Sequence, residues 1–168
     1  MTSTIDSDVL LYAQIDSRLV RDLLSRYELE THLVNDLKSI PGSFWGEQEA
    51  GLIANRLYLR NDTPLHSILH EACHYICMDS QRRAELDTDA GSDNDEENAV
   101  CYLQILLADE ITGLGRERIL SDMDAWGYSF RLGSAAAWFQ NDARETRDWL
   151  EGHGIINRFN QPQKRKRN

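Results

Sequence analysis

The clearest structural signal in the chain is the segment TPLHSILHEACHYICMD, residues 63–79. It holds three of the five histidines, His66, His70 and His74, each four residues after the last, and Glu71 directly follows the second. Three imidazoles on one stripe of an otherwise apolar segment need a reason, because a buried polar group costs free energy unless it is bonded. The segment therefore calls for both a structural and a functional explanation.

The residues just before the histidines predict the start of a helix. Asn61, Asp62 and Thr63 are helix-capping residue types, and Pro64 suits the first turn of a helix. We therefore predict a helix over 64–78, which contains the whole histidine stripe.

On this helix His70 and His74 share one face, because residues four apart lie one turn above the other. Both imidazoles can therefore bind one metal ion, and neutral imidazole is a common zinc ligand. Glu71 lies about 100° further round the helix, so we expect it to reach a water bound to the metal. The metal lowers the pKa of that water, and the carboxylate takes its proton during attack on a carbonyl group. This is the chemistry of the His-Glu-x-x-His motif, here HEACH, with Glu71 as the predicted catalytic residue.

Two histidines leave a catalytic zinc site one protein ligand short, because such sites usually have three protein ligands and an open position. No histidine follows His74 until His153, so a carboxylate from the acidic segment 79–98 is the natural third ligand. Six acids of this segment are candidates: Asp87, Asp89, Asp93, Asp95, Glu96 and Glu97.

Among these acids we predict Glu96 as the third metal ligand. Ala99 lies three residues later, on the same face of a helix, and a small residue there lets the histidine helix come close. Glu97 is the second choice and Asp93 the third.

The remaining pattern predicts an α+β fold, with a small antiparallel or mixed sheet packed on several helices, including the helix of the HExxH motif. A strand near Leu57–Leu59 should form an edge of the sheet, where an extended peptide could pair with it. The other predicted elements are a helix over 15–27, a strand or linker at 29–34, a second strand before a turn near Ala54-Asn55, a helix from Asp95, a short helix within 113–127 and a last helix over 133–154.

Two stretches together resemble the gluzincin metallopeptidases, RLYLRNDTPLHSILHEACHYI at 56–76 and EENAVCYLQILLAD at 96–109. The chain is especially similar to the small ImmA/IrrE-like group, in which a strand precedes HExxH and a later helix supplies a glutamate ligand. The resemblance covers about a third of the chain. It implies a zincin-like fold, Zn²⁺ held by His70, His74 and Glu96, and catalysis by Glu71.

The chain departs from this family pattern at two places. Cys73 stands in the fourth position of the motif, where family members often have glycine. The third-ligand helix reads Glu97-Asn98-Ala99, where the family has the order Glu-Ala-Asn. The substrate of a named subfamily can therefore not be assigned to this chain.

A peptidase also needs a hydrogen-bond donor for the developing oxyanion. The candidates are Tyr102, Tyr128, Arg131 and His153. We favour His153 or Tyr128, because both follow the second predicted helix in glycine-containing segments that could fold over a cleft. For His66 two interpretations stay open, a residue that tunes the site or one that packs at the helix start.

Length and charge limit the function classes. A chain of 168 residues suits one compact domain, which we place at 1–160, followed by a basic tail at 161–168 that we expect to be disordered. The net charge of −10 argues against nucleic acid as a partner, because an acidic surface repels phosphates.

No apolar run is long enough for a transmembrane helix, and the N-terminus lacks the basic region of a secretory signal. Three cysteines are an odd set, which fits free thiols in the cytoplasm.

The sequence therefore predicts a cytoplasmic, zinc-dependent metallohydrolase, above all a peptidase that cleaves a peptide or protein substrate. We expect a monomer without a membrane or nucleic-acid partner. The main alternative is a zincin-like protein that binds metal for regulation or interaction without turnover. A further alternative is an interaction domain that binds no metal.

Overall fold

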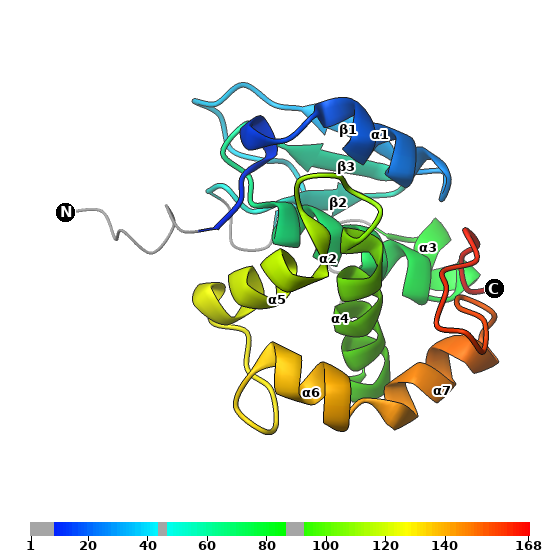
Figure 1. Cartoon of the computed structure of the whole chain (residues 1–168). Coiled ribbons are helices and arrows are strands. Elements are labelled where there is room, and N and C mark those ends of the chain that lie inside the picture. The colour runs from blue at the N-terminus through cyan, green and yellow to red at the C-terminus, as the bar shows by residue number, and fades with distance from the viewer. Residues whose placement is uncertain (1–8, 44–46, 87–92) are drawn as a thin grey trace.

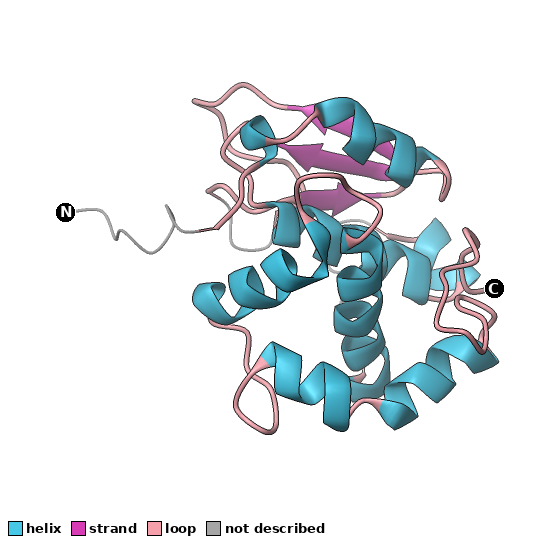
Figure 2. Cartoon of the chain, viewed as in Figure 1, coloured by secondary structure: helices cyan, strands magenta, loops and turns pink. Residues whose placement is uncertain are grey.

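The structure, a computed structural model, describes residues 9–43, 47–86 and 93–168. Within these ranges the chain forms seven α-helices, a short 3-10 helix and a three-stranded mixed sheet, which confirms the predicted α+β class (Figures 1 and 2). The elements in chain order are η2 (Tyr12–Gln14), α1 (Ser17–Ser25), β1 (Glu30–Leu33), β2 (Gly51–Ile53), β3 (Arg56–Leu59), α2 (Leu65–Cys77), α3 (Ser80–Ala84), α4 (Asn94–Ala108), α5 (Gly115–Trp126), α6 (Ala135–Asn141) and α7 (Arg144–Gly152).

The sheet has the strand order β1-β3-β2, with β1 parallel and β2 antiparallel to β3. Leu57 and Leu59 of β3 are fully buried, whereas Arg56 is exposed and Tyr58 is partly exposed. Buried and more exposed side chains therefore alternate along the strand, as the sequence predicts. β3 is nevertheless the middle strand and not an edge. The expectation that Leu57–Leu59 would pair with an extended peptide is therefore wrong, because both sides of this strand are already bonded.

The outer edge of β2 lies against the backbone of Pro41–Ser43. A Cβ atom on Gly51 would lie 2.0 Å from the carbonyl oxygen of Pro41 and 2.5 Å from the amide nitrogen of Ser43. A Cβ atom on Gly42 would lie 2.9 Å from the amide nitrogen of Leu52. Glycine at both positions therefore permits a close backbone approach that a side chain would prevent.

Helix α2 is the central element of the fold. It contacts β2 and β3 on one side and α4 on the other (Figure 1). Eleven of its thirteen residues are buried, and His70 and Glu71 are the two that are not. A helix covered on several sides shields nearly all of its side chains from water, so the two partly exposed residues mark where solvent reaches α2.

The second long helix, α4, crosses α2 and forms the other half of the core. The carboxylate of Asp93 accepts a hydrogen bond from the amide of Glu96 at 2.9 Å and so caps the start of the helix. Helices α5 and α7 pack against α4, and α6 packs against α5. Buried residues run along nearly the whole of α4 from Ala99 to Ala108, which matches its place between other helices.

The helices differ from the sequence prediction at two places. The start of the acidic segment 79–98, where the sequence predicts no element before Asp95, contains the short helix α3, which Asp79 caps by accepting from the amide of Arg82. The single last helix predicted over 133–154 is two helices, α6 and α7, separated at Asp142 and Ala143. The backbone of these two residues leaves the helical region, with φ values of −136° and −113°.

The basic segment 161–168, which the sequence predicts to be disordered, lies against the end of α2. The amide of Arg167 donates to the carbonyl oxygen of Ile76 at 2.9 Å. The guanidinium of Arg83 donates to the carbonyl oxygens of Tyr75 and Arg167, at 2.8 and 2.6 Å. The last carbonyls of a helix have no partner within it, and cationic groups there are favourable. The backbone of this segment and the Arg83 side chain therefore bond to carbonyl oxygens at the end of α2.

No helix in the described part of the chain has the length and apolar character needed to cross a membrane.

Candidate metal centre

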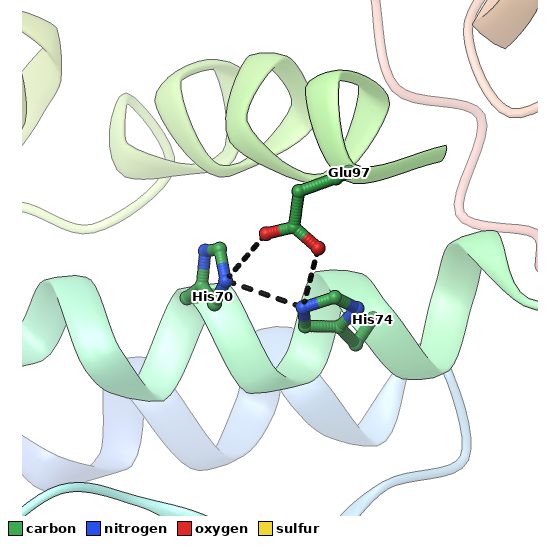
Figure 3. Close-up of side chains that lie close together, drawn as sticks. All are labelled: His70, His74 and Glu97. Atoms are coloured by element: carbon green, nitrogen blue, oxygen red, sulfur yellow. Dashed lines mark hydrogen bonds and ion pairs between the residues drawn. The ribbon is translucent and has the colours of Figure 1, made fainter. Parts of the chain in front are cut away.

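The structure brings the side chains of His70, His74 and Glu97 together between α2 and α4 (Figure 3). The Nε2 atoms of the two histidines are 3.2 Å apart. One Glu97 oxygen lies 3.2 Å from His70 Nε2, and the other lies 3.3 Å from His74 Nε2. The two imidazole rings stand nearly perpendicular, at 83°. The three side chains thus form a ligand triangle, in which each Glu97 oxygen faces one histidine and one ligand atom from each residue lies within 4.8 Å of the others.

These distances fit a tetrahedral zinc ion. Two nitrogen ligands at 2.0–2.1 Å from a tetrahedral centre lie roughly 3.3 Å apart. The two histidine nitrogens, 3.2 Å apart, are close to this value, and each lies within 3.3 Å of one oxygen of Glu97. One ion between the three side chains can therefore bind both nitrogens and the carboxylate. The side chain of Glu97 is 44% exposed, whereas those of His70 and His74 are 19% and 8% exposed. Solvent therefore reaches the site from the Glu97 side, where a fourth position could hold water.

The third residue of the cluster is Glu97 and not Glu96, the residue predicted first. Glu96 lies one residue earlier on α4, and its buried carboxylate forms ion pairs with Arg82 at 2.9 Å and Arg167 at 3.3 Å. Both carboxylate oxygens of Glu96 accept from Arg82, so the side chain is held away from the histidines. The second choice of the sequence analysis, Glu97, is the one that the geometry supports.

The other acidic candidates do not join the cluster. Asp93 caps α4 through the amide of Glu96, and Asp95 is exposed. Asp87 and Asp89 lie outside the described residues. The choice of third ligand among described residues therefore rests on Glu97 alone.

In the metal-free cluster, the surroundings shift the pKa values of His70 and Glu97 in opposite directions. Burial lowers the pKa of His70, but the neighbouring Tyr128, the Cys101 thiol and the Glu97 carboxylate together raise it well above its usual value. Burial raises the pKa of Glu97, but hydrogen bonds from His70 and His74 outweigh this and hold it well below its usual range. A carboxylate bridging two imidazoles favours the charged forms of both partners. The metal-free cluster therefore pairs a protonated His70 with the Glu97 carboxylate, and a cation that bound there would replace that proton.

Glu71 follows His70 on α2 but does not belong to the ligand triangle. Its side chain is half-buried, and burial raises the pKa of its carboxyl above the usual value, with Glu49 adding to the effect. Glu49 in turn accepts a hydrogen bond at 3.1 Å from the indole of Trp126. A carboxylate with a raised pKa beside a metal site is suited to accept and return a proton.

The candidate oxyanion donors lie in different places. Tyr128 stacks edge-on against His70, with ring centres 5.6 Å apart. The other three candidates bond elsewhere: Tyr102 donates to Asn160, Arg131 pairs with Asp142, and His153 packs against Trp149. Tyr128 is therefore the only one of the four that contacts the histidine cluster.

The hydroxyl of Tyr128 is already engaged with His66. It lies 3.1 Å from His66 Nδ1 and 3.3 Å from Gln104 Nε2. Burial lowers the pKa of His66 to about 3, so this histidine is neutral. It also packs against Trp126 with ring centres 4.9 Å apart. His66 therefore packs at the start of α2 and contacts Tyr128, while a role in tuning the site stays a prediction.

Two residues of the site were missed in the sequence, Gln104 and Glu49. Gln104 is fully buried, and its Oε1 atom lies 3.0 Å from His70 Nδ1. The sequence does contain a signal for Gln104. Glu97, Cys101 and Gln104 follow one another at spacings of four and three, which places them on one face of a helix. Glu49 has no comparable signal, since it lies outside any regular element.

Comparison of the chain with protein-family models, with curated proteins and with solved structures gives no match. The functional conclusion therefore depends on the geometry of the site and on the chemistry of its residues.

Proposed function

We propose that the protein is a zinc-dependent metallohydrolase, most specifically a peptidase of the gluzincin type. The observation that carries the proposal is the convergence of His70, His74 and Glu97, with the two Nε2 atoms 3.2 Å apart and each within 3.3 Å of one Glu97 oxygen. Its spacing fits one tetrahedral ion, and the sequence between the two histidines is that of the HExxH motif.

The proposed roles follow from position. His70 and His74 supply neutral nitrogen ligands, and Glu97 supplies an oxygen ligand and balances the charge of the ion. When bound, a zinc ion lowers the pKa of a water and polarises a substrate carbonyl. Glu71 takes the proton of the attacking water and passes it to the leaving amine. The raised pKa of Glu71 supports the first transfer, because a more basic carboxylate takes a proton from water more readily.

Two measurements test this proposal together. Elemental analysis of protein purified without a metal-affinity tag should give one zinc per chain. A mixture of quenched fluorescent peptides should then be cleaved by the native protein but not by Glu71→Gln, which keeps the shape of the side chain and loses its basicity. Glu71→Gln should retain its zinc, since Glu71 lies outside the ligand triangle. Full activity of the zinc-loaded Glu71→Gln protein would refute the role of Glu71.

A second function is favoured by the surroundings of Tyr128. Its hydroxyl accepts from Gln104 and can donate to His66, so its proton is not directed at a substrate. A zinc site without an oxyanion donor would suit metal-dependent regulation or binding of a partner. This alternative predicts stoichiometric zinc with no cleavage of any peptide, and the same two measurements therefore distinguish it from the enzyme.

We also propose a reducing compartment, such as the cytoplasm, as the site of action. Cys73, Cys77 and Cys101 are free and buried, and burial raises the pKa of Cys73 and Cys77. Thiols in this state are poor nucleophiles and pack as small apolar side chains. Titration of the protein of unchanged sequence, unfolded in denaturant, with a thiol reagent should find three reduced cysteines.

A further inference from the structure

Gln104 occupies a position at which both ends of its amide have defined partners. Its Nε2 atom lies 2.8 Å from the carbonyl oxygen of His66, which can only accept a hydrogen bond. The NH₂ group of Gln104 must therefore face His66, and the amide oxygen must face the other way. That oxygen lies 3.0 Å from Nδ1 of His70.

The orientation of this amide determines the proton position on His70. An amide oxygen can only accept, so Nδ1 of His70 must carry the proton in this contact. A neutral imidazole has one proton, and Nε2 of His70 is then left with its lone pair. Nε2 is the atom that lies 3.2 Å from Glu97 and from His74 Nε2. The contact thus selects the form of His70 that can bind a metal through Nε2.

The side chain of Gln104 is itself held in place by its neighbours. Gln104 is fully buried on α4, two helical turns after Glu97, so one helix carries both the third ligand and this amide. Its Nε2 atom also lies 3.3 Å from the hydroxyl of Tyr128, whose own proton can then go to Nδ1 of His66. His74 has no such partner, because its buried Nδ1 atom lacks a hydrogen bond within the described ranges.

We infer that Gln104 is a positioning residue of the metal centre, which holds the ring of His70 with its proton on Nδ1 and its Nε2 lone pair directed at the ion. This inference deepens the proposed function and rests on it for the identity of the ion. The hydrogen-bonding pattern of His70 is independent of any ion and can be tested separately. Groups that orient a metal-binding histidine in this way typically contribute 10–100-fold to metal affinity.

The first experiment determines the proton position on His70 in the metal-free protein. Long-range ¹H–¹⁵N NMR of labelled protein at alkaline pH, with a chelator present, distinguishes a protonated Nδ1 from a protonated Nε2. We expect the native protein to show a protected Nδ1–H on His70. We expect Gln104→Met, which has a similar shape and no amide, to lose this protection. A native His70 protonated on Nε2 would overturn the inference, and this result needs no variant to fold.

The second experiment measures zinc affinity by competition with a chromophoric chelator. Gln104→Met should raise the zinc Kd by roughly 10–100-fold. Gln104→Glu should restore most of the affinity, because a carboxyl oxygen can still accept from Nδ1–H of His70. The matched control is Ser67→Ala, which removes a buried hydrogen bond of α2 to the amide of Ala50, 3.0 Å long, without touching the cluster. Its Kd should stay within about twofold of the native value, a factor worth less than half a kcal/mol.

The outcomes separate the two proposals. If the native protein binds no zinc, the metal centre is refuted, while the NMR result still decides the role of Gln104 in holding His70. If the native protein binds zinc and Gln104→Met binds it equally well with the Nδ1–H of His70 still protected, the positioning role is refuted and the metal centre stands. Equal losses of affinity in Gln104→Met and Ser67→Ala would also refute the role, because the effect would then be one of general stability.

Discussion

Glu96 and Glu97 are neighbours in the first turn of α4 and have opposite surroundings. Glu96 is 2% exposed and lies between two guanidinium groups, whereas Glu97 is 44% exposed and faces two imidazoles. A step of one residue turns a side chain by about 100° on a helix. One glutamate can therefore hold the helix in place while the next is available to a cation.

This division of roles predicts different effects for two conservative substitutions. Glu97→Gln removes a charged ligand and should raise the zinc Kd by roughly 100-fold or more, since even outer groups contribute 10–100-fold. Glu96→Gln should leave zinc stoichiometry unchanged and lower the free energy of unfolding by about 1–3 kcal/mol, because two guanidinium groups lose their charged partner. Chelator competition and urea denaturation measure the two quantities. A loss of zinc binding in Glu96→Gln with normal binding in Glu97→Gln would contradict this assignment.

The raised pKa of His70 predicts that zinc uptake depends on pH. Below this raised pKa, His70 carries a proton on the nitrogen that zinc requires. Zinc must then displace one proton, so the zinc Kd should rise about tenfold for each unit by which the pH falls. Competition titrations between pH 8 and pH 5.5 measure this slope. A Kd that stays constant over the range would show that His70 binds no proton in the free site.

The same ion pair predicts the reverse trend for the metal-free protein. A folded-state pKa raised above the unfolded value, about 6.5 for histidine, gives stability that is present below pH 6.5. This contribution is lost as the pH rises through the folded-state pKa. Glu97, whose pKa is lowered, contributes above its unfolded pKa of about 4.3 and loses that contribution in acid. With a chelator present, urea denaturation should find the native protein losing more stability between pH 6 and 8.5 than Glu97→Gln.

At the residue level the sequence places His70 and His74 on one face of a helix and predicts a carboxylate beside them, and the structure brings the two histidines to Glu97. The catalytic role of Glu71 stays a prediction. The sequence did not predict which of two adjacent glutamates faces the histidines. The rotation of α4 about its axis depends on partners distant in the chain, since Arg167 lies 71 residues from Glu96. Ala99 is fully buried, as the choice of Glu96 assumed, but its burial does not determine which neighbouring acid faces α2.

At the level of elements, the segments with strong periodicity were predicted well. The helix expected over 64–78 is α2, at Leu65–Cys77, and the helix expected from Asp95 is α4, which starts at Asn94. The errors lie where local signals conflict with tertiary contacts. Helices α6 and α7 separate at Asp142, whose carboxylate pairs with Arg131 of the preceding loop. This contact is not visible in the local sequence pattern.

The segment at 161–168 predicts a measurable contribution to the stability of α2 and α4. Arg167 pairs with Glu96, bonds to the carbonyl of Cys77 and lies over the ring of Trp149, at 5.2 Å. Arg167→Ala should lower the free energy of unfolding by about 1 kcal/mol, because its side chain is only partly exposed and the pair is partly screened. The matched control is Arg165→Ala at an exposed position, which should change stability by less than about 0.5 kcal/mol. Equal effects in urea denaturation would mean that the contacts of Arg167 contribute nothing specific.

For the whole molecule, zinc should stabilise the folded state, since the ligand triangle exists only after α2 and α4 have packed together. Free zinc at 100 times its Kd adds about 2.7 kcal/mol to the free energy of unfolding. In a protein of this size 1 kcal/mol raises the Tm by about 2–4 °C, so the expected shift is roughly 5–10 °C. Differential scanning calorimetry with zinc and with chelator measures it. An equal shift in Glu97→Gln would place the ion elsewhere.

In the proposed peptidase, the close contact between Gly51 and the Pro41–Ser43 backbone would restrict how a substrate is held. β3 is paired on both sides, and the Pro41–Ser43 backbone lies close to β2 at Gly51 and Leu52. A peptide that extended the sheet at these two residues would have to share this space with that backbone. Recognition at this end of β2 would then depend more on side chains than on main-chain hydrogen bonds.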